Sequence, residues 1–180
     1  LDELELELIE GVSRHAKKAS RKLFDRATVP RDALFQSLIP YRVIRRLGFT
    51  DIYELGPGSG YLGALCLEQG GIEHRALEVT QPFYFWQATL WSTWDLHTFH
   101  EPWWEQMQNG WSWLDDTNAI VACHMLNEMH INALDHALAL SRRMLAQSGG
   151  ALLVECLGSD VTRKGEETRA HIARSGVRLI

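Results

Sequence analysis

Residues 51–60 read Asp-Ile-Tyr-Glu-Leu-Gly-Pro-Gly-Ser-Gly, and the overlapping residues 60–63 read Gly-Tyr-Leu-Gly. The isoleucine and tyrosine favour a strand, the glycines favour a turn, and a helical pattern opens at Tyr61. Glycines allow positive φ angles and close approach of a ligand, and the following helix presents free N–H groups. A strand, a glycine-rich turn and a helix in this order predict a binding site for a nucleotide-type ligand.

Two classes of cofactor bind at such a strand-turn-helix site. Residues 58–63 satisfy the G-x-G-x-x-G spacing of dinucleotide sites, so an NAD-dependent oxidoreductase is one alternative. Residues 54–60, Glu-Leu-Gly-Pro-Gly-Ser-Gly, resemble the first motif of class I S-adenosylmethionine-dependent methyltransferases, an acidic residue followed by G-x-G-x-G. A carboxylate attracts the ammonium and sulfonium of that cofactor but repels a pyrophosphate. Glu54 therefore favours the methyl donor.

A second acidic residue supports the same architecture. Residues 74–79 read as a strand that ends near Glu78, about twenty positions beyond the glycine turn. A carboxylate at this place can accept hydrogen bonds from ribose hydroxyls in both cofactor classes. The resemblance to the methyltransferases implies the following cofactor-binding residues: Glu54, Gly56, Gly58, Gly60, Tyr61, Glu78 and Val79.

Length and composition describe an ordinary folded domain. The chain has 180 residues, 46% of them hydrophobic, which is enough for one sizeable core. The formal net charge of −5 argues against broad nucleic-acid binding. Cys66, Cys123 and Cys156 are far apart, so we expect buried free thiols in a reducing compartment. No apolar run is long enough to span a membrane and no signal peptide is visible, so we expect a cytoplasmic protein. The first residue is Leu1, which leaves open whether a targeting segment precedes it.

Strands alternate with helices along the chain, which predicts right-handed crossovers and a parallel sheet. The expected fold class is α/β, a doubly wound and mainly parallel Rossmann-like sheet with helices on both faces. Residues 1–50 form an N-terminal helical cap or interface segment, and residues 51–180 form the methyltransferase domain. We place strands at 96–99, 118–124 and 151–157, and helices at 131–145 and 161–174. Residues 177–180 would begin a sixth strand, so the last strand of the family is expected to be missing.

The leading helices and the tryptophans each allow two interpretations. Helices are expected over residues 1–26 and 32–47, with Pro40 interrupting the second. They would form a cap over the cofactor or an oligomer interface such as a homodimer contact. The later half of the first helix is basic, which is a solvated face or a site for an anionic partner. All seven tryptophans fall between residues 86 and 113, where they suit packed layers or a substrate-facing wall.

Methyl transfer requires alignment of acceptor and methyl group, and removal of a proton from a hydroxyl acceptor. The loop after the strand at 118–124 would face the cofactor because ligands bind at the carboxyl ends of parallel strands. A histidine near its ordinary pKa suits a base, and a glutamate could orient it or bind the acceptor. The catalytic candidates in this loop are His124, Glu128 and His130, with Asn127 beside them.

Resemblance to known methyltransferases restricts the class of molecule that we expect as the methyl acceptor. The loop reads Asn127-Glu-Met-His130, without the Pro-Pro-aromatic signature of the enzymes that methylate nucleic-acid amino groups, and Cys123 lacks the preceding proline of cytosine C5 enzymes. The runs Leu-Asn-Glu-Met and Glu-Val-Thr-Gln-Pro-Phe-Tyr are similar to provisionally assigned sugar O-methyltransferases of bacterial gene clusters. The resemblance spans residues 53–157 and implies S-adenosylmethionine as cofactor and a small hydroxylated acceptor.

A metal site and two other functions are weighed beside this prediction. Two groups of residues are rich in metal-ligand types, but no spacing fixes a third ligand, so no metal site is predicted. The groups are His97, His100 and Glu101, and His124, Glu128 and His130. A non-catalytic methyltransferase-like subunit would fit a chain that lacks the last strand. RNA modification through the basic helix would require binding that depends steeply on salt.

Overall fold

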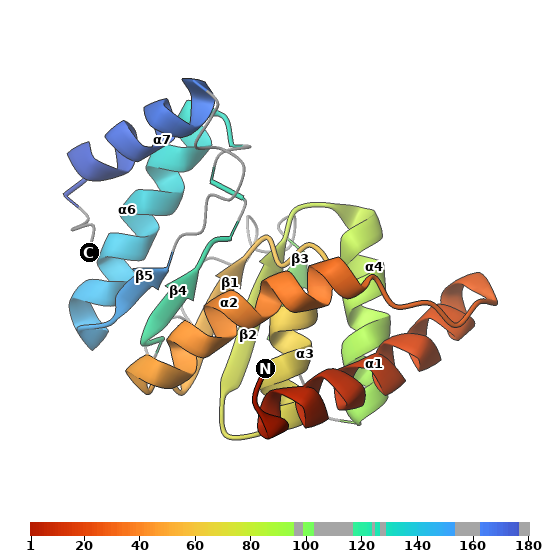
Figure 1. The fold of residues 1–180 in the computed structure, drawn as a ribbon. Helices are drawn as coiled ribbons and strands as arrows, with labels where there is room; N and C mark the ends of the chain where they lie inside the picture. Colours follow the sequence, from red (N-terminus) through yellow and green to blue (C-terminus); the bar gives the residue numbers. More distant parts are fainter. Residues whose placement is uncertain (96–98, 103–116, 124, 127–128, 154–162, 177–180) are drawn as a thin grey trace.

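The computed structural model describes residues 1–95, 99–102, 117–123, 125–126, 129–153 and 163–176 (Figure 1). Within these residues the strands are β1 (Asp51–Leu55), β2 (Glu73–Glu78), β3 (Phe99–Pro102), β4 (Ala119–Val121) and β5 (Ala151–Leu153). The α-helices are α1 (Glu3–Phe24), α2 (Arg31–Leu47), α3 (Tyr61–Gln69), α4 (Gln81–Trp91), α6 (Ile131–Ser148) and α7 (Arg163–Arg174). A 3-10 turn, η1 (Ser92–Trp94), follows α4.

The strands form a sheet in the order β3-β2-β1-β4-β5, and every neighbouring pair is parallel. The chain runs outward from β1 through β2 to β3 and then returns to β4 on the other side of β1. In open parallel sheets this reversal leaves a crevice at the carboxyl ends of the strands, where ligands bind. The sheet and its helices are a Rossmann-like α/β fold, which confirms the predicted fold class.

Strand alternation divides the core into two layers. Neighbouring residues of a strand point to opposite faces of the sheet. Ile52, Ala76 and Val121 belong to one buried cluster with side chains of α1, α2, α3 and α4. Tyr53 and Ile120 belong to a second cluster with side chains of α6 and α7. Helices therefore cover both faces, as Figure 1 shows. Ile52 of β1 and Ala76 of β2 pack with α3 and α4, so the even-numbered residues of these two strands share that face.

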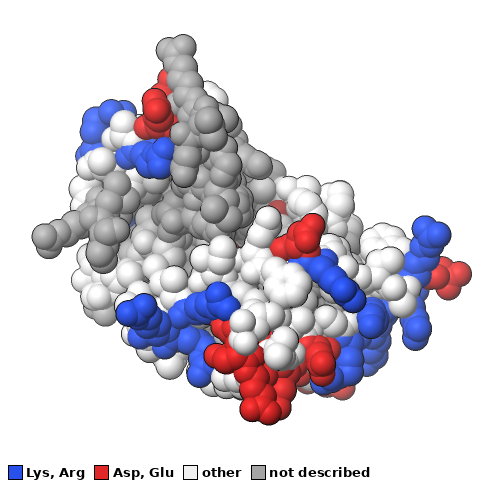
Figure 2. Space-filling model, viewed as in Figure 1, with Lys and Arg blue, Asp and Glu red and all other residues white. Residues whose placement is uncertain are grey.

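The N-terminal helices are packed onto the sheet domain. α1 begins with a capping box in which Asp2 and Glu5 bond each other's backbone N–H groups. Acidic residues of α1 lie in its first half and basic residues in its second, which complements the helix dipole. Figure 2 shows acidic side chains over the start of this helix and basic side chains farther along it. The basic side chains of the second half are exposed, which fits both a solvated face and a site for an anionic partner.

The prediction that Pro40 interrupts the second helix is wrong. α2 continues from Arg31 to Leu47 with Pro40 inside it. Proline costs about 3 kcal/mol in a helix because it lacks an N–H and crowds the carbonyl four residues earlier. Here the turns on either side are held by side chains buried in the core, among them Leu38 and Tyr41. Burial of these residues outweighs the local cost.

The third strand lies later in the chain than predicted. We placed it at 96–99, whereas β3 starts at Phe99 and ends at Pro102, and residues 96–98 lie outside the described residues. β3 pairs only with β2 in the described sheet, and an edge strand tolerates proline because one side of its backbone is unpaired. His100 is accommodated because its ring stacks on Tyr84.

The other predicted elements agree with the structure where it describes them. α3 begins at Tyr61, as predicted, and α6 extends three residues past the predicted end. β4 is shorter than the predicted strand at 118–124, β5 agrees with the predicted strand at 151–157 as far as Leu153, and residues 124, 154–162 and 177–180 lie outside the described residues. The prediction of a sixth strand at 177–180 therefore falls there too. No helix in the described part is long and apolar enough to cross a membrane.

Candidate functional site

A cavity of about 320 Å³ opens where β1, β2 and β4 end. This volume is at the lower end of the range for small-molecule sites. The loop after β1 forms its floor, and α2 forms one wall through a turn that includes Gln36, Ser37 and Pro40. The lining residues from the strand ends and following loops are Glu54, Gly56, Pro57, Gly58, Ser59, Glu78, Val79, Thr80, Cys123 and Met125. The cavity thus occupies the crevice that the sheet topology predicts.

The glycines of the loop have positive φ angles, and they differ in what surrounds them. φ is +65° at Gly56, +53° at Gly58 and +70° at Gly60. A Cβ at Gly56 would lie 2.7 Å from Sδ of Met125, so that side chain would have to move to admit any residue other than glycine. A Cβ at Gly58 would meet only the carbonyl oxygen of Gly56, at 4.0 Å. Since Gly58 lines the cavity, a side chain there would occupy space that a ligand can use.

The fourth glycine of the loop region explains the dinucleotide-like spacing. A Cβ at Gly63 would lie 2.6 Å from Cε1 of His74 and 2.8 Å from Cζ2 of Trp91. Both rings are buried against the start of α3. Gly63 is therefore required by packing inside the protein, whichever cofactor binds, and the G-x-G-x-x-G spacing gives no independent support for NAD.

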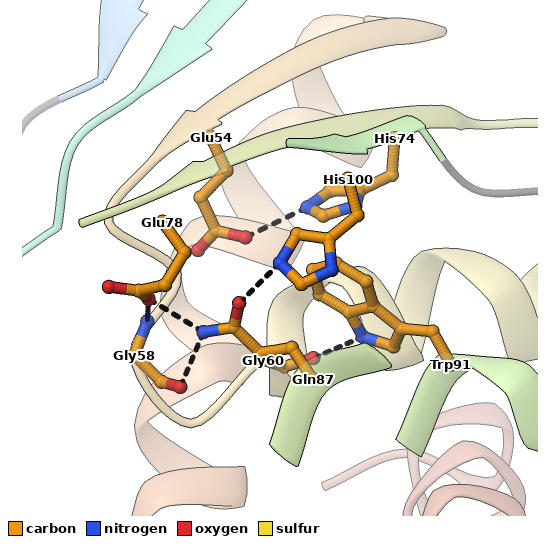
Figure 3. A network of polar contacts seen from close by, with 8 residues as sticks. All are labelled: Glu54, Gly58, Gly60, His74, Glu78, Gln87, Trp91 and His100. Carbon is orange, nitrogen blue, oxygen red and sulfur yellow. Dashed lines mark hydrogen bonds and ion pairs between the residues drawn. The ribbon is translucent and has the colours of Figure 1, made fainter. Parts of the chain in front are cut away.

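Glu54 ends in a buried pair with His74. Nε2 of His74 lies 2.8 Å from Oε2 of Glu54 (Figure 3). A carboxylate can only accept, so the histidine donates. Nδ1 of His74 is buried and has no hydrogen-bond partner among the described residues. The pair fixes the orientation of the Glu54 carboxylate, and within the described part of the chain no hydrogen bond to its other oxygen, Oε1, is present, so Oε1 can bond a ligand in the cavity that Glu54 lines.

Glu78 is 2% exposed, and its carboxylate accepts hydrogen bonds from four N–H donors. Its Oε1 accepts from the backbone N–H groups of Val79 and Thr80, both at 2.8 Å. Its Oε2 accepts from the backbone N–H of Gly58 at 3.1 Å and from Nε2 of Gln87 at 2.7 Å (Figure 3). A carboxylate offers about four lone-pair positions. Glu78 thus ties the glycine loop to the end of β2, and a ribose hydroxyl would have to share it with these donors.

Two residues of this network were not identified from the sequence. Gln87 is fully buried in α4 and also donates to the carbonyl of Gly58 at 2.7 Å, and its Oε1 lies 2.7 Å from Nε2 of His100. Burial, with a smaller contribution from His74, lowers the pKa of His100 to about 3. The signal in the sequence is an amide among the aromatic and apolar residues in the middle of α4.

The remaining predicted site residues have different surroundings. Tyr61 is buried, and its hydroxyl has no hydrogen-bond partner among the described residues; burial raises its pKa to about 12. His130 is exposed and caps α6, with Nδ1 accepting from the backbone N–H of Asn132 at 3.4 Å. Neither residue lines the cavity. The predictions for His124 and Glu128 lie outside the described residues.

The charged side chains that line the cavity in the described structure are all acidic. The lining residues that the structure describes include the carboxylates Glu54 and Glu78 but no lysine or arginine. In the described part of the chain, no group of three His, Cys, Asp or Glu residues could hold a metal ion. Cys66 is a buried free thiol, Cys123 is half-buried, and Cys156 lies outside the described residues. The site is suited to a cationic ligand.

Comparison with known proteins gives independent information about the fold. No protein-family model and no curated protein sequence matches the chain. A provisionally assigned O-methyltransferase from Klebsiella pneumoniae has a similar solved structure, with 12% identity and a TM-score of 0.51 over 99% of this chain and 80% of that chain. The plantazolicin methyltransferase BpumL in complex with SAH matches with 10% identity and a TM-score of 0.43 over 97% of this chain and 74% of that chain. The first similarity shows that the chain has the Rossmann-like fold of methyltransferases.

Proposed function

We propose that this protein is an S-adenosylmethionine-dependent methyltransferase that methylates an oxygen of a small hydroxylated acceptor, such as a sugar. The observation that carries the proposal is the cavity at the end of β1, where Glu54 and Gly58 both line the space and no described lining residue is cationic. S-adenosylmethionine carries an ammonium and a sulfonium, and its attraction to a carboxylate is strong in a site sheltered from water. A dinucleotide pyrophosphate would meet two carboxylates instead.

The chain's own residues fit this cofactor. Glu54 would hold the ammonium through the oxygen that His74 leaves unoccupied. Gly58 offers a backbone surface without a side chain. Glu78 and Val79 would lie along the ribose and adenine, with the hydroxyls joining the donors already on Glu78. When bound, the cofactor supplies a methyl group activated by its sulfonium.

The protein must then align an acceptor hydroxyl and remove its proton. The wall formed by α2 presents Gln36 and Ser37 to the cavity, and both can bond hydroxyl groups. We propose that residues 1–50 act as a cap that completes the acceptor site. His124, Glu128 and His130 remain the proposed base and acceptor-binding residues, since they follow the strand that ends at this cavity.

Transfer of an isotopically labelled methyl group tests the proposal. The full chain is incubated with methyl-labelled S-adenosylmethionine and a panel of sugars, other hydroxylated metabolites, amines and short RNAs. We expect label in a base-stable ether on a hydroxylated small molecule, and a loss of transfer in Glu54→Gln. Label on an amine or on RNA would contradict the acceptor class. Absence of transfer to every acceptor, with cofactor bound, would favour the non-catalytic alternative.

A further inference from the structure

Three consecutive carbonyls of the glycine loop accept hydrogen bonds from side chains of a single helix, α4. Gln87 Nε2 donates to the carbonyl of Gly58 at 2.7 Å, Trp86 Nε1 to that of Ser59 at 2.9 Å, and Trp91 Nε1 to that of Gly60 at 2.9 Å. Figure 3 shows the contacts of Gln87 and Trp91. We call these three side chains the α4 clasp. The carbonyls of the loop are therefore held toward α4.

The orientation of Gln87 within the clasp is determined by its neighbours. Its amide nitrogen faces a peptide carbonyl and the Glu78 carboxylate, and both can only accept. Its oxygen therefore faces Nε2 of His100, which must be the donor. The low pKa of His100 keeps this ring neutral at physiological pH, so its hydrogen is on Nε2. All polar atoms of the Gln87 side chain are thus bonded, and the side chain has one favoured position.

A loop rich in glycine needs such support. Glycine has the largest conformational freedom of any residue, and a flexible loop loses that freedom when a ligand orders it. Support that orders the loop beforehand lowers this cost and raises the affinity. Three backbone N–H groups of the loop are also bonded: that of Gly56 to the carbonyl of Leu77, that of Gly58 to the Glu78 carboxylate and that of Gly60 to the carbonyl of Pro57. The clasp holds the loop through its carbonyls instead, at three consecutive residues.

We propose that Trp86, Gln87 and Trp91 are positioning residues, which hold the glycine loop in its ligand-binding shape before the ligand arrives. The inference rests on the proposed function, because there the loop binds S-adenosylmethionine. It also gives the tryptophan cluster a role that is neither simple packing nor a wall for the substrate. Its indole N–H groups, rather than its ring faces, would serve the cofactor site.

The chain offers a matched pair of indoles to test this. Trp86 and Trp94 are both half-buried, both stack on another ring, and both donate one N–H at 2.8–2.9 Å. Trp86 bonds the loop, whereas Trp94 bonds Oε2 of Glu68, away from the cavity. Phenylalanine at either position keeps an aromatic ring and removes the N–H. Trp91 is less suitable because its ring is fully buried and truncation would open a hole in the core.

The experiment measures S-adenosylhomocysteine affinity by calorimetry for the full chain, Trp86→Phe, Gln87→Met and Trp94→Phe. We expect Trp86→Phe to weaken binding about three- to tenfold and Gln87→Met to weaken it by more, since it removes three hydrogen bonds, one of them to the loop carbonyl of Gly58 and one to Glu78. Trp94→Phe should lower the melting temperature at least as much as Trp86→Phe, yet leave the affinity within about twofold of wild type. Unchanged affinity in both clasp variants, or equal loss in Trp94→Phe, would overturn the proposal.

Amide hydrogen exchange of the unliganded proteins separates this inference from the proposed function. The amides of Gly58 and Gly60 should exchange faster in Trp86→Phe than in wild type or Trp94→Phe, because opening of the loop becomes easier. If wild type does not bind S-adenosylhomocysteine, the proposed cofactor is wrong, and exchange alone then decides whether the clasp holds the loop. Equal exchange in Trp86→Phe and wild type would refute the clasp.

Discussion

Replacing Gly58 with alanine adds one methyl group at the point where the loop faces the cavity. Among the described residues, the added Cβ would meet no atom closer than the Gly56 carbonyl oxygen at 4.0 Å, so it clashes with none of them. The cost to the fold is the backbone strain of an L-residue at φ +53°, about 1–2 kcal/mol. For a chain of this length we expect the melting temperature to fall by roughly 2–8 °C.

Gly48 is the matched control for this substitution. It ends α2 with φ +74°, and a Cβ there would have nothing within 4 Å. It precedes β1, whereas Gly58 follows the carboxyl end of that strand, so the two positions lie at opposite ends of the sheet. Gly48→Ala should therefore carry the same strain without touching the cavity.

The two variants separate strain from ligand contact. A methyl group forced against a closely fitted ligand costs about 1–3 kcal/mol, which corresponds to roughly 5- to 150-fold weaker binding. We expect this loss of S-adenosylhomocysteine affinity in Gly58→Ala, measured by calorimetry, and no loss in Gly48→Ala. If both variants melt at similar temperatures and bind the ligand as wild type does, Gly58 does not face the cofactor.

Three further substitutions test separate contacts. Glu54→Gln removes the carboxylate and should weaken S-adenosylhomocysteine binding by about tenfold or more, measured by calorimetry; equal binding would exclude Glu54 as the ammonium ligand. His100 has a folded-state pKa of about 3 against an ordinary 6.5. As the pH falls below 6.5, this histidine is protonated in the unfolded chain but not in the folded protein, so the free energy of unfolding decreases. His100→Gln should remove up to about 2 kcal/mol of the wild-type stability loss between pH 7 and pH 5 in denaturant titrations, and parallel pH profiles would refute this. The hydrogen bond from Arg42 lowers the pKa of Glu5 to about 2, so this pair stabilises the fold above pH 4.5 and less as pH falls toward 2. Arg42→Ala should lower the melting temperature at pH 7 and approach wild type near pH 2; a constant difference would contradict the pair's role.

Local sequence patterns predict the helices and strands whose ends are marked by glycine or proline. The bounds of α3 follow from Gly60 and Gly70, and the strand β1 follows from its β-branched and aromatic residues. Pro40 was misjudged because a local rule was applied where burial of the neighbouring turns decides the outcome. The start of β3 was missed because its pairing with β2, and not its own composition, makes His100 a strand residue.

The polar network around the loop depends on long-range register. His74 lies beside Ile52, and His100 lies beside Ala76, which places both rings on the face of the sheet under α4. Sequence periodicity identifies which residues share a face but not which strands are neighbours. The partners of Gln87 are therefore not readable from the chain, although a buried amide among aromatic residues indicates that some partner exists.

Thermal unfolding with S-adenosylhomocysteine and with NADH, each at about one hundred times its expected dissociation constant, tests the central claim most directly. A ligand that binds only the native state at this concentration adds about 2.7 kcal/mol of stability, which raises the melting temperature of a chain of 180 residues by roughly 5–11 °C. The account predicts this rise with S-adenosylhomocysteine and none with NADH. A rise with NADH alone, or with neither ligand, would contradict the assignment of the cavity to a methyl donor.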